Sequence, residues 1–176
     1  SKRLVDETID KFKKANLPLD IISGGGTGEE WESKELGFTE HRSGSYVYEG
    51  LSRIKGAGDG SDLSPERCPL RVVTTIVSVP TSDRLIVDAG MKTFRLFPSM
   101  PYGLILDDPE LKFSGMSVEH GHIDSTGTNR KFSVGDKLTV IPTYQEGVTN
   151  LHDEIVWIRN DQVEHVWRNE GRGKVK

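Results

Sequence analysis

The chain has 176 residues, a formal net charge of −4 at pH 7 and a pI near 5.8. This length is enough for a hydrophobic core in one or two small domains. A mildly acidic chain without a basic block argues against binding to nucleic acid or to a membrane surface, and no apolar run is long enough to cross a bilayer. The single cysteine, Cys68, excludes an internal disulfide and predicts a reducing, cytoplasmic location.

The first third of the chain predicts alternating helices and strands. Residues 2–15 favour an amphipathic helix because apolar side chains recur on one face, at Leu4, Val5, Ile9 and Phe12. Asn16 and Pro18 then end the helix. The pattern next predicts a strand to Ile22, a glycine loop, a short helix over residues 29–36 and a second strand over residues 38–48.

The glycine loop, residues 23–28, reads Ser-Gly-Gly-Gly-Thr-Gly. Consecutive glycines let a backbone approach an anion closely and adopt positive φ, and Ser23 and Thr27 add hydroxyl groups. A nucleoside triphosphate does not fit, because its binding loop needs a lysine after the last glycine and Glu29 stands there. Taken alone, the loop is best interpreted as a flexible turn.

A second turn of the same kind follows at Arg42-Ser43-Gly44-Ser45. Two adjacent strand-to-turn units that end in glycine and hydroxyl residues match the phosphate corner formed by the last two loops of a (β/α)₈ barrel. Strand alternation places Glu40, Arg42 and Gly44 on one face. The alternatives are a surface arginine on an edge strand and an ordinary turn.

Residues 55–66 are rich in Gly, Ser and Asp and mark a boundary. After it the pattern predicts strands over residues 70–79, 84–88, 138–141, 155–158 and 163–167, with turns at 134–136 and at Asn160-Asp161. We therefore expect three regions: residues 1–55, a linker over 56–69, and a mainly antiparallel β domain over 70–176.

Seven motifs in register resemble the C-terminal half of the D-threonine aldolase and D-serine dehydratase family. They are SGGGTG, TEHRSGSYVY, VVTTIVSVPTSDRLIVDAG, SVEHGHI, VGDKLTVIP, VTNLHDE and the closing GRG. The family's enzymes are pyridoxal-phosphate lyases. The resemblance implies α/β plus β architecture: the last strand-helix units of an alanine-racemase-like (β/α)₈ barrel, followed by the antiparallel β domain.

The resemblance also implies roles for individual residues. Backbone N–H groups and hydroxyls would contact the cofactor phosphate at Gly25, Gly26, Thr27, Gly44 and Ser45. In the alanine racemases, which share the barrel, an arginine at the place of Arg42 faces the pyridine nitrogen, whereas D-threonine aldolases tend to have glutamine there. If Arg42 points into the barrel, it would keep that nitrogen unprotonated, because a nearby positive charge disfavours a pyridinium. Glu119 and His120 would form a pocket wall.

The metal site is where the sequence departs from the family. The family carries a His-x-Cys or His-x-Asp pair after the proline of the VIP strand, and the matching residues here are Tyr144 and Glu146. A neutral tyrosine is a poor zinc ligand, so we expect no zinc, or altered metal use. If their segment is a strand, His120 and His122 share a face and could form a metal pair, but their motif is not the family's metal element.

A complete barrel takes roughly 250 residues, so we expect the chain to be a fragment or a truncated homologue. The family's cofactor-binding lysine belongs to the missing N-terminal half, and no catalytic residue is assigned here. Three hypotheses follow: part of a lyase for D-3-hydroxy amino acids that works as a homodimer, a degenerate homologue that binds the cofactor without catalysis, or a β interaction module.

Overall fold

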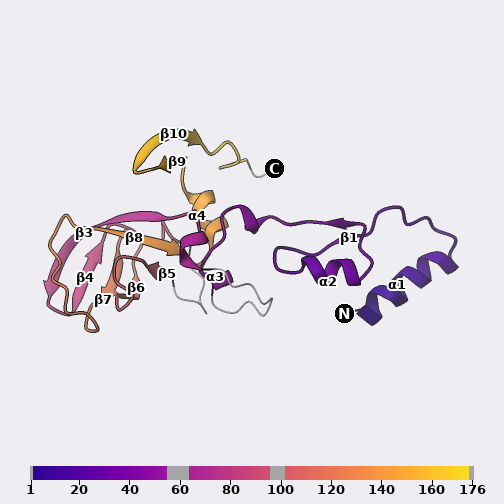
Figure 1. The fold of residues 1–176 in the computed structure, drawn as a ribbon, viewed down its shortest axis with the longest axis horizontal. Coiled ribbons are helices and arrows are strands. Elements are labelled where there is room, and N and C mark those ends of the chain that lie inside the picture. Colours follow the sequence, from indigo (N-terminus) through magenta and orange to yellow (C-terminus); the bar gives the residue numbers. More distant parts are fainter. Residues whose placement is uncertain (1, 55–63, 96–101, 175–176) are drawn as a thin grey trace. The chain divides into compact units, whose positions relative to one another are not determined.

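The computed structural model describes residues 2–54, 64–95 and 102–174, and they form two compact units (Figure 1). The first unit ends at Val47, and the second begins at Tyr48. The predicted linker lies mostly outside the described residues, so the division into three regions stays a prediction. Among the helices of the described ranges, none has both the length and the apolarity that crossing a bilayer requires.

The first unit contains α1 (Lys2–Lys14), β1 (Ser23–Gly24), α2 (Glu30–Glu35), β2 (Glu40–His41) and the 3₁₀ turn η1 (Ser45–Val47). Both predicted helices are confirmed. Asn16 ends α1 with a left-handed φ of 59°, while the N–H of Leu17 donates to the carbonyl of Phe12. These two features define a Schellman-type helix end, which asparagine accepts more readily than most residues.

Both predicted strands of the first unit are much shorter than expected. The expected strand up to Ile22 is replaced by β1 (Ser23–Gly24), and that over residues 38–48 is reduced to β2 (Glu40–His41). The two strands pair in parallel, Ser23 with Glu40 and Gly24 with His41. The ladder ends there because Gly25, at φ +75°, turns the chain away from its partner.

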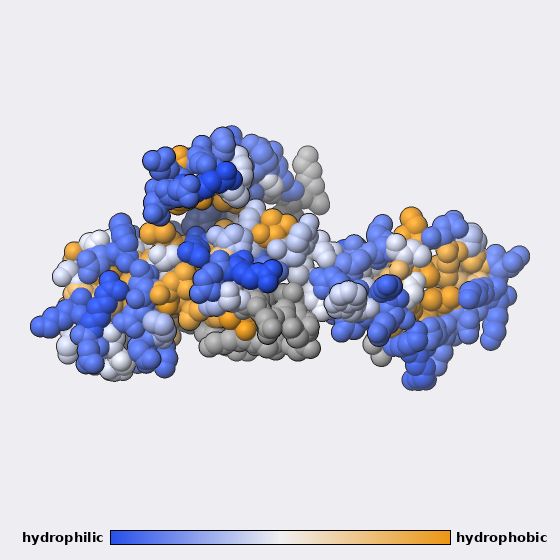
Figure 2. All heavy atoms as spheres, viewed as in Figure 1, coloured by the Kyte–Doolittle hydropathy of each residue, from blue (hydrophilic) through white to orange (hydrophobic). Residues whose placement is uncertain are grey.

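The apolar side of α1 faces the segment before β1 and forms an open groove. Figure 2 shows apolar side chains at this surface. The groove is lined by Leu4, Ile9, Phe12, Leu19, Ile21 and Phe38.

The second unit is a mainly antiparallel β domain, as predicted. Its elements are α3 (Leu51–Ile54), η2 (Pro65–Arg67), β3 (Val72–Thr81), β4 (Arg84–Val87), β5 (Gly103–Ile105), β6 (Lys112–Met116), β7 (Gly121–Asp124), β8 (Lys137–Pro142), α4 (Gln145–Leu151), β9 (Glu154–Arg159) and β10 (Gln162–Arg168). Six of the strands form one sheet in the order β5-β8-β3-β4-β7-β6. The outer strands β5 and β6 approach each other, so the sheet is nearly closed (Figure 1).

The long strand β3 holds this sheet together. Its first part, Val72 to Thr75, pairs with β8, and its remainder pairs with β4. The strand passes through Pro80, where we expected it to end. The β3–β4 register shifts between Ser78 and Thr81, and at such an irregularity a proline removes no regular ladder hydrogen bond.

Alternating side chains of these strands form the core of the second unit. Fully buried members are Ile76, Val87, Ile123, Leu138 and Val140, and Phe94 packs edge-to-face with Phe113 at 5.6 Å between ring centroids. Burial of this apolar surface is the main force that stabilises the sheet.

Strands β9 and β10 form a separate two-stranded sheet. The predicted turn at Asn160 and Asp161 is confirmed, with φ of 49° and 58°, the left-handed pair that a two-residue hairpin turn needs. Most apolar side chains of the hairpin are exposed, among them Trp157 and Trp167, and Ile155 is half-buried.

Candidate functional site

The two glycine-containing turns come together at the ends of β1 and β2. The N–H of Arg42 donates to the carbonyl of Gly24 at 3.3 Å, and the N–H of Gly44 donates to the hydroxyl of Thr27 at 3.1 Å. The loops therefore lie side by side, as the sequence predicted. We call residues 25–27 and 42–45 the double loop.

Gly25 is fixed in the double loop by packing. Its φ of +75° favours glycine. A Cβ atom at this position would meet the Oγ of Ser33 and lie 2.6 Å from the Nδ1 of His41. These two side chains share a hydrogen bond of 3.0 Å, and Ser33 is 3% exposed. The Ser33–His41 pair thus supports the loop from inside the unit.

Gly26 and Gly44 face open space instead. A Cβ atom built on either would meet nothing within 4 Å, so backbone here is open to a ligand. Because the Thr27 oxygen accepts from Gly44, the Thr27 hydroxyl proton remains to be donated outward. The Gly44 N–H is already satisfied by Thr27, so it contributes to the double loop by holding Thr27.

One loop donor is satisfied by the chain itself. The N–H of Gly28 donates to both carboxylate oxygens of Glu30 at 3.0 Å. This carboxylate occupies the end of the glycine run, so the open part of the loop is Gly26 and Thr27.

Arg42 follows β2 directly and is exposed. Its neighbour on the same strand face, Glu40, accepts a hydrogen bond of 2.5 Å from the hydroxyl of Ser23. Ser45 is half-buried and begins η1. Arg42 is therefore the first residue of the second turn of the double loop, and its exposed side chain is available to an anionic or aromatic ligand.

Every lysine in the described ranges is exposed. Among them, Lys2 donates to the Glu35 carbonyl, and Lys11, Lys13 and Lys14 lie in the last turn of α1. A lysine that binds a cofactor carbonyl is usually desolvated, whereas these lysines are solvated charges.

In the second unit, Glu119 and His120 lie in the exposed turn between β6 and β7. The carboxylate of Glu119 pairs with Lys92 at 2.5 Å. The backbone of this turn packs tightly against Gly90, because a Cβ atom on Gly90 would lie 2.5 Å from the backbone nitrogen of His120. A role as pocket wall stays a prediction.

Tyr144 and Glu146 flank the start of α4 and are half-buried, while Gln145 between them is 2% exposed. Nowhere in residues 2–54, 64–95 and 102–174 do three histidine, cysteine, aspartate or glutamate side chains gather as a metal site would require. A phenol and one carboxylate do not fit the zinc pair that the family resemblance implies.

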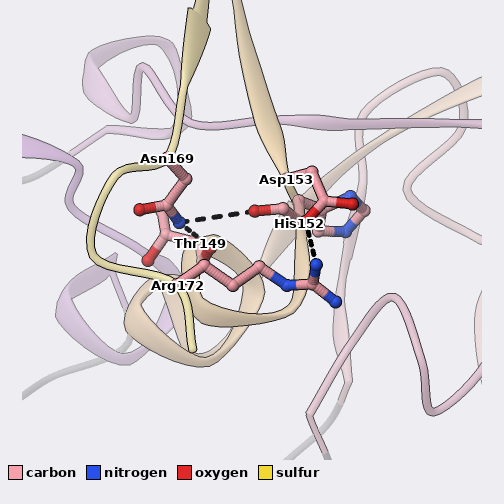
Figure 3. A network of polar contacts seen from close by, with 5 residues as sticks. All are labelled: Thr149, His152, Asp153, Asn169 and Arg172. Atoms are coloured by element: carbon pink, nitrogen blue, oxygen red, sulfur yellow. Dashed lines mark hydrogen bonds and ion pairs between the residues drawn. The ribbon is translucent and has the colours of Figure 1, made fainter. Parts of the chain in front are cut away.

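The C-terminal end of α4 is tied to the end of the chain (Figure 3). The side-chain amide of Asn169 donates to the carbonyls of Thr149 and His152, and Arg172 pairs with Asp153. These contacts satisfy carbonyls that a helix end leaves without partners, so the tail fixes the position of α4.

Cys68 is fully buried. Burial raises the pKa of its thiol, and the charge of Glu49 adds to the effect. A neutral buried thiol is a poor nucleophile, so Cys68 is a packing residue.

The model of the family described as "Putative serine dehydratase domain" matches residues 69–158. This chain belongs to that family. D-threonine aldolase of an Arthrobacter species is 30% identical over 92% of the chain and 42% of its own length. 3-Hydroxy-D-aspartate aldolase of Paracoccus denitrificans is 32% identical over 97% of the chain and 44% of its own length. The chain thus spans less than half the length of these two relatives.

A shorter relative also matches. An uncharacterized protein of Mycobacterium tuberculosis is 25% identical over 66% of this chain, and the match covers 97% of that protein. Proteins that consist almost wholly of this matched region therefore exist.

Solved structures confirm the predicted fold. D-threonine aldolase of Filomicrobium marinum superposes with a TM-score of 0.81 at 22% identity, over 99% of this chain and 47% of its own. D-threo-3-hydroxyaspartate dehydratase of a Delftia species superposes with a TM-score of 0.74, over 91% of this chain and 46% of its own. Alanine racemase of Clostridium difficile superposes with a TM-score of 0.51, over 92% of this chain and 48% of its own. The chain has the architecture of the C-terminal part of these alanine-racemase-like proteins.

Sequence reasoning missed three residues that shape these sites. Ser33 belongs to no motif, and His41 stands within the TEHRSGSYVY motif without a role assigned to it; only their contact behind Gly25 reveals the pair. Arg95 lies with its Cζ 5.6 Å from the centre of the Tyr144 ring, and no local pattern connects two residues so far apart in sequence.

Proposed function

We propose that this chain is the C-terminal part of a pyridoxal-phosphate-dependent lyase that acts on D-3-hydroxy amino acids. The first unit would contact the cofactor phosphate, and Glu119 and His120 would contribute a pocket wall. The observation that carries the proposal is the double loop: two turns joined by the Thr27–Gly44 hydrogen bond, with Gly26 facing open space. The aldolase names of the two relatives support the reaction class.

The double loop fits a phosphate because its donors are fixed before a ligand arrives. Open backbone at Gly26, the Thr27 hydroxyl and the Ser45 segment offer hydrogen bonds to a dianion without a lysine. Gly25 holds this arrangement through Ser33 and His41.

Arg42 would orient the ring end of the cofactor. Its permanent charge disfavours protonation of a nearby pyridine nitrogen. When bound, the cofactor supplies the electron-withdrawing ring that the family's bond cleavage needs. Zinc has no part in this proposal, because Tyr144 and Glu146 do not fit it.

Turnover would need more than the described residues. The exposed lysines are unsuited to hold the cofactor carbonyl, so we propose that an N-terminal barrel half completes the site. We also propose a homodimer as the working state and a cytoplasmic location, the latter on the strength of the single cysteine.

A second candidate is a degenerate homologue that binds the cofactor or another small phosphate without catalysis. Tyr144 and Glu146 at the metal positions favour it, as does the short mycobacterial relative. A third candidate, a β interaction module, is favoured by the exposed apolar side chains of the β9–β10 hairpin.

The test is calorimetric titration of the chain with pyridoxine phosphate, which lacks the aldehyde that would react with the exposed lysines. We expect binding that Gly26→Asp abolishes by placing a carboxylate beside the phosphate. Gly26→Ala is the matched control, since its methyl group has open space, and it should retain affinity.

A second pair of variants tests the hydroxyl. Thr27→Val should weaken binding by about tenfold or more, because a hydrogen bond to a charged group contributes about 1.5–3 kcal/mol. Thr27→Ser should restore affinity. Equal affinity of the native chain and Gly26→Asp would refute the double loop as the phosphate site.

A further inference from the structure

The start of α4 carries a positive charge that the sequence analysis did not assign. The Arg95 guanidinium lies over the Tyr144 ring, with Cζ 5.6 Å from the ring centre, within the range of a cation–π contact. Gly147 makes this possible, because a Cβ there would lie 2.7 Å from the Arg95 Cβ and 2.8 Å from the Tyr144 Cδ1.

Arg95 is exposed and keeps its charge available. Within the described ranges it forms no ion pair, whereas the nearby Lys92 is paired with Glu119. An arginine stacked on an aromatic ring is held in one orientation, and its planar fork of donors matches a carboxylate.

This charge lies next to one of the two positions at which the family resemblance implies metal ligands. A permanent guanidinium charge repels a divalent cation, and Tyr144 does not supply the histidine of the family pair. The same structure that disfavours a metal ion therefore favours an anion.

We propose that Arg95 and Tyr144 form a carboxylate-binding site that replaces the metal site in this chain. The ligand class is a small molecule bearing a free carboxylate.

Titration of the chain with malonate, followed by amide NMR shifts, tests the anion site. Malonate should shift the amide signals of Tyr144 and Gly147. Arg95→Ala should weaken binding at least tenfold, whereas Tyr144→Phe, which keeps the ring, should retain it. Arg130→Ala is the matched control, because Arg130 also stacks on an aromatic ring, with Cζ 4.8 Å from the centre of Phe132.

Metal binding is the second measurement. The native chain should bind no zinc through Glu146, so Glu146→Ala should leave zinc binding unchanged. Tyr144→His combined with Glu146→Cys should gain cobalt binding with a thiolate absorbance band. Adding Arg95→Ala should then tighten cobalt binding at least tenfold.

Three results would overturn the proposal: zinc bound by the native chain and lost in Glu146→Ala, malonate shifts unchanged in Arg95→Ala, or cobalt affinity unchanged by Arg95→Ala. Neither the malonate titration nor the metal-binding measurement uses the cofactor. Failure here would leave the phosphate-site test with pyridoxine phosphate unaffected, so the two proposals fail separately.

Discussion

Replacement of Gly25 by alanine should disrupt the double loop, although it adds one methyl group. The new Cβ would meet the Ser33 Oγ and lie 2.6 Å from the His41 Nδ1. Ser33 is 3% exposed, so its hydroxyl has little room to move. The backbone at φ +75° adds a second cost, because a side chain disfavours that conformation.

The two costs add to a large local effect. A left-handed φ costs a non-glycine residue about 1–2 kcal/mol, and overpacking costs about 1–3 kcal/mol. We expect Gly25→Ala to destabilise the β1–β2 pair by about 2–5 kcal/mol. Since about 1.4 kcal/mol corresponds to a factor of ten, local opening should increase by about thirtyfold or more.

Hydrogen exchange of the paired amides measures this opening directly, since it reports local as well as global unfolding. The amide of Arg42, which donates to Gly24, is the reporter. Gly26→Ala is the control and should exchange like the native chain, because its Cβ meets nothing within 4 Å.

A second substitution tests the cause. Ser33→Ala removes the closest atom, so the double variant Gly25→Ala/Ser33→Ala should be less destabilised than the two single effects combined. Equal Arg42 exchange in Gly25→Ala and Gly26→Ala would refute the packing argument. So would an unprotected Arg42 amide in the native chain.

Three further changes test the second unit. Asp88→Ala should cost about 1–2 kcal/mol in urea unfolding, because the buried Thr74 hydroxyl loses its acceptor. Burial alone would raise the pKa of Asp88, but hydrogen bonds from Thr74 and Thr75 lower it overall, so the native carboxylate stabilises the fold above the usual aspartate range. This contribution should be lost as pH falls through the lowered pKa, and the variant should lack that pH dependence. Ile123→Ala, at a fully buried position, should cost about 2–5 kcal/mol. Asp161→Gly should stabilise the β9–β10 hairpin by up to about 1 kcal/mol, because φ is 58° there, and its amides should exchange more slowly.

The sequence predicted elements whose own residues determine them. Helix α1 follows from its apolar period, and its end follows from Asn16. The strands β3, β4 and β8 are rich in β-branched residues, and the β9–β10 turn follows from Asn160 and Asp161.

Elements that depend on distant partners were missed. Strands β5, β6 and β7 were not predicted. Strand β6 reads Lys-Phe-Ser-Gly-Met and shows little alternation, while β5 and β7 have only three and four residues. Helix α4 contains Gly147 and a β-branched threonine, both weak helix formers, and the tail residues Asn169 and Arg172 hold it in place.

The candidate site also has a part that the sequence predicted and a part that it did not. The motifs led to the double loop, and the structure brings Thr27 and Gly44 into contact. The Ser33–His41 pair behind Gly25 and the Arg95–Tyr144 contact were not predicted. Both depend on packing between residues that are separated in the sequence.

The most direct test of the account is an amide NMR comparison of pyridoxine phosphate with pyridoxine, which lacks the phosphate. We predict that pyridoxine phosphate shifts the signals of Gly26, Thr27 and Ser45, that pyridoxine does not, and that Gly26→Asp removes the effect. Shifts that are equal for both compounds, or that fall outside the double loop, would contradict a phosphate site at these two turns.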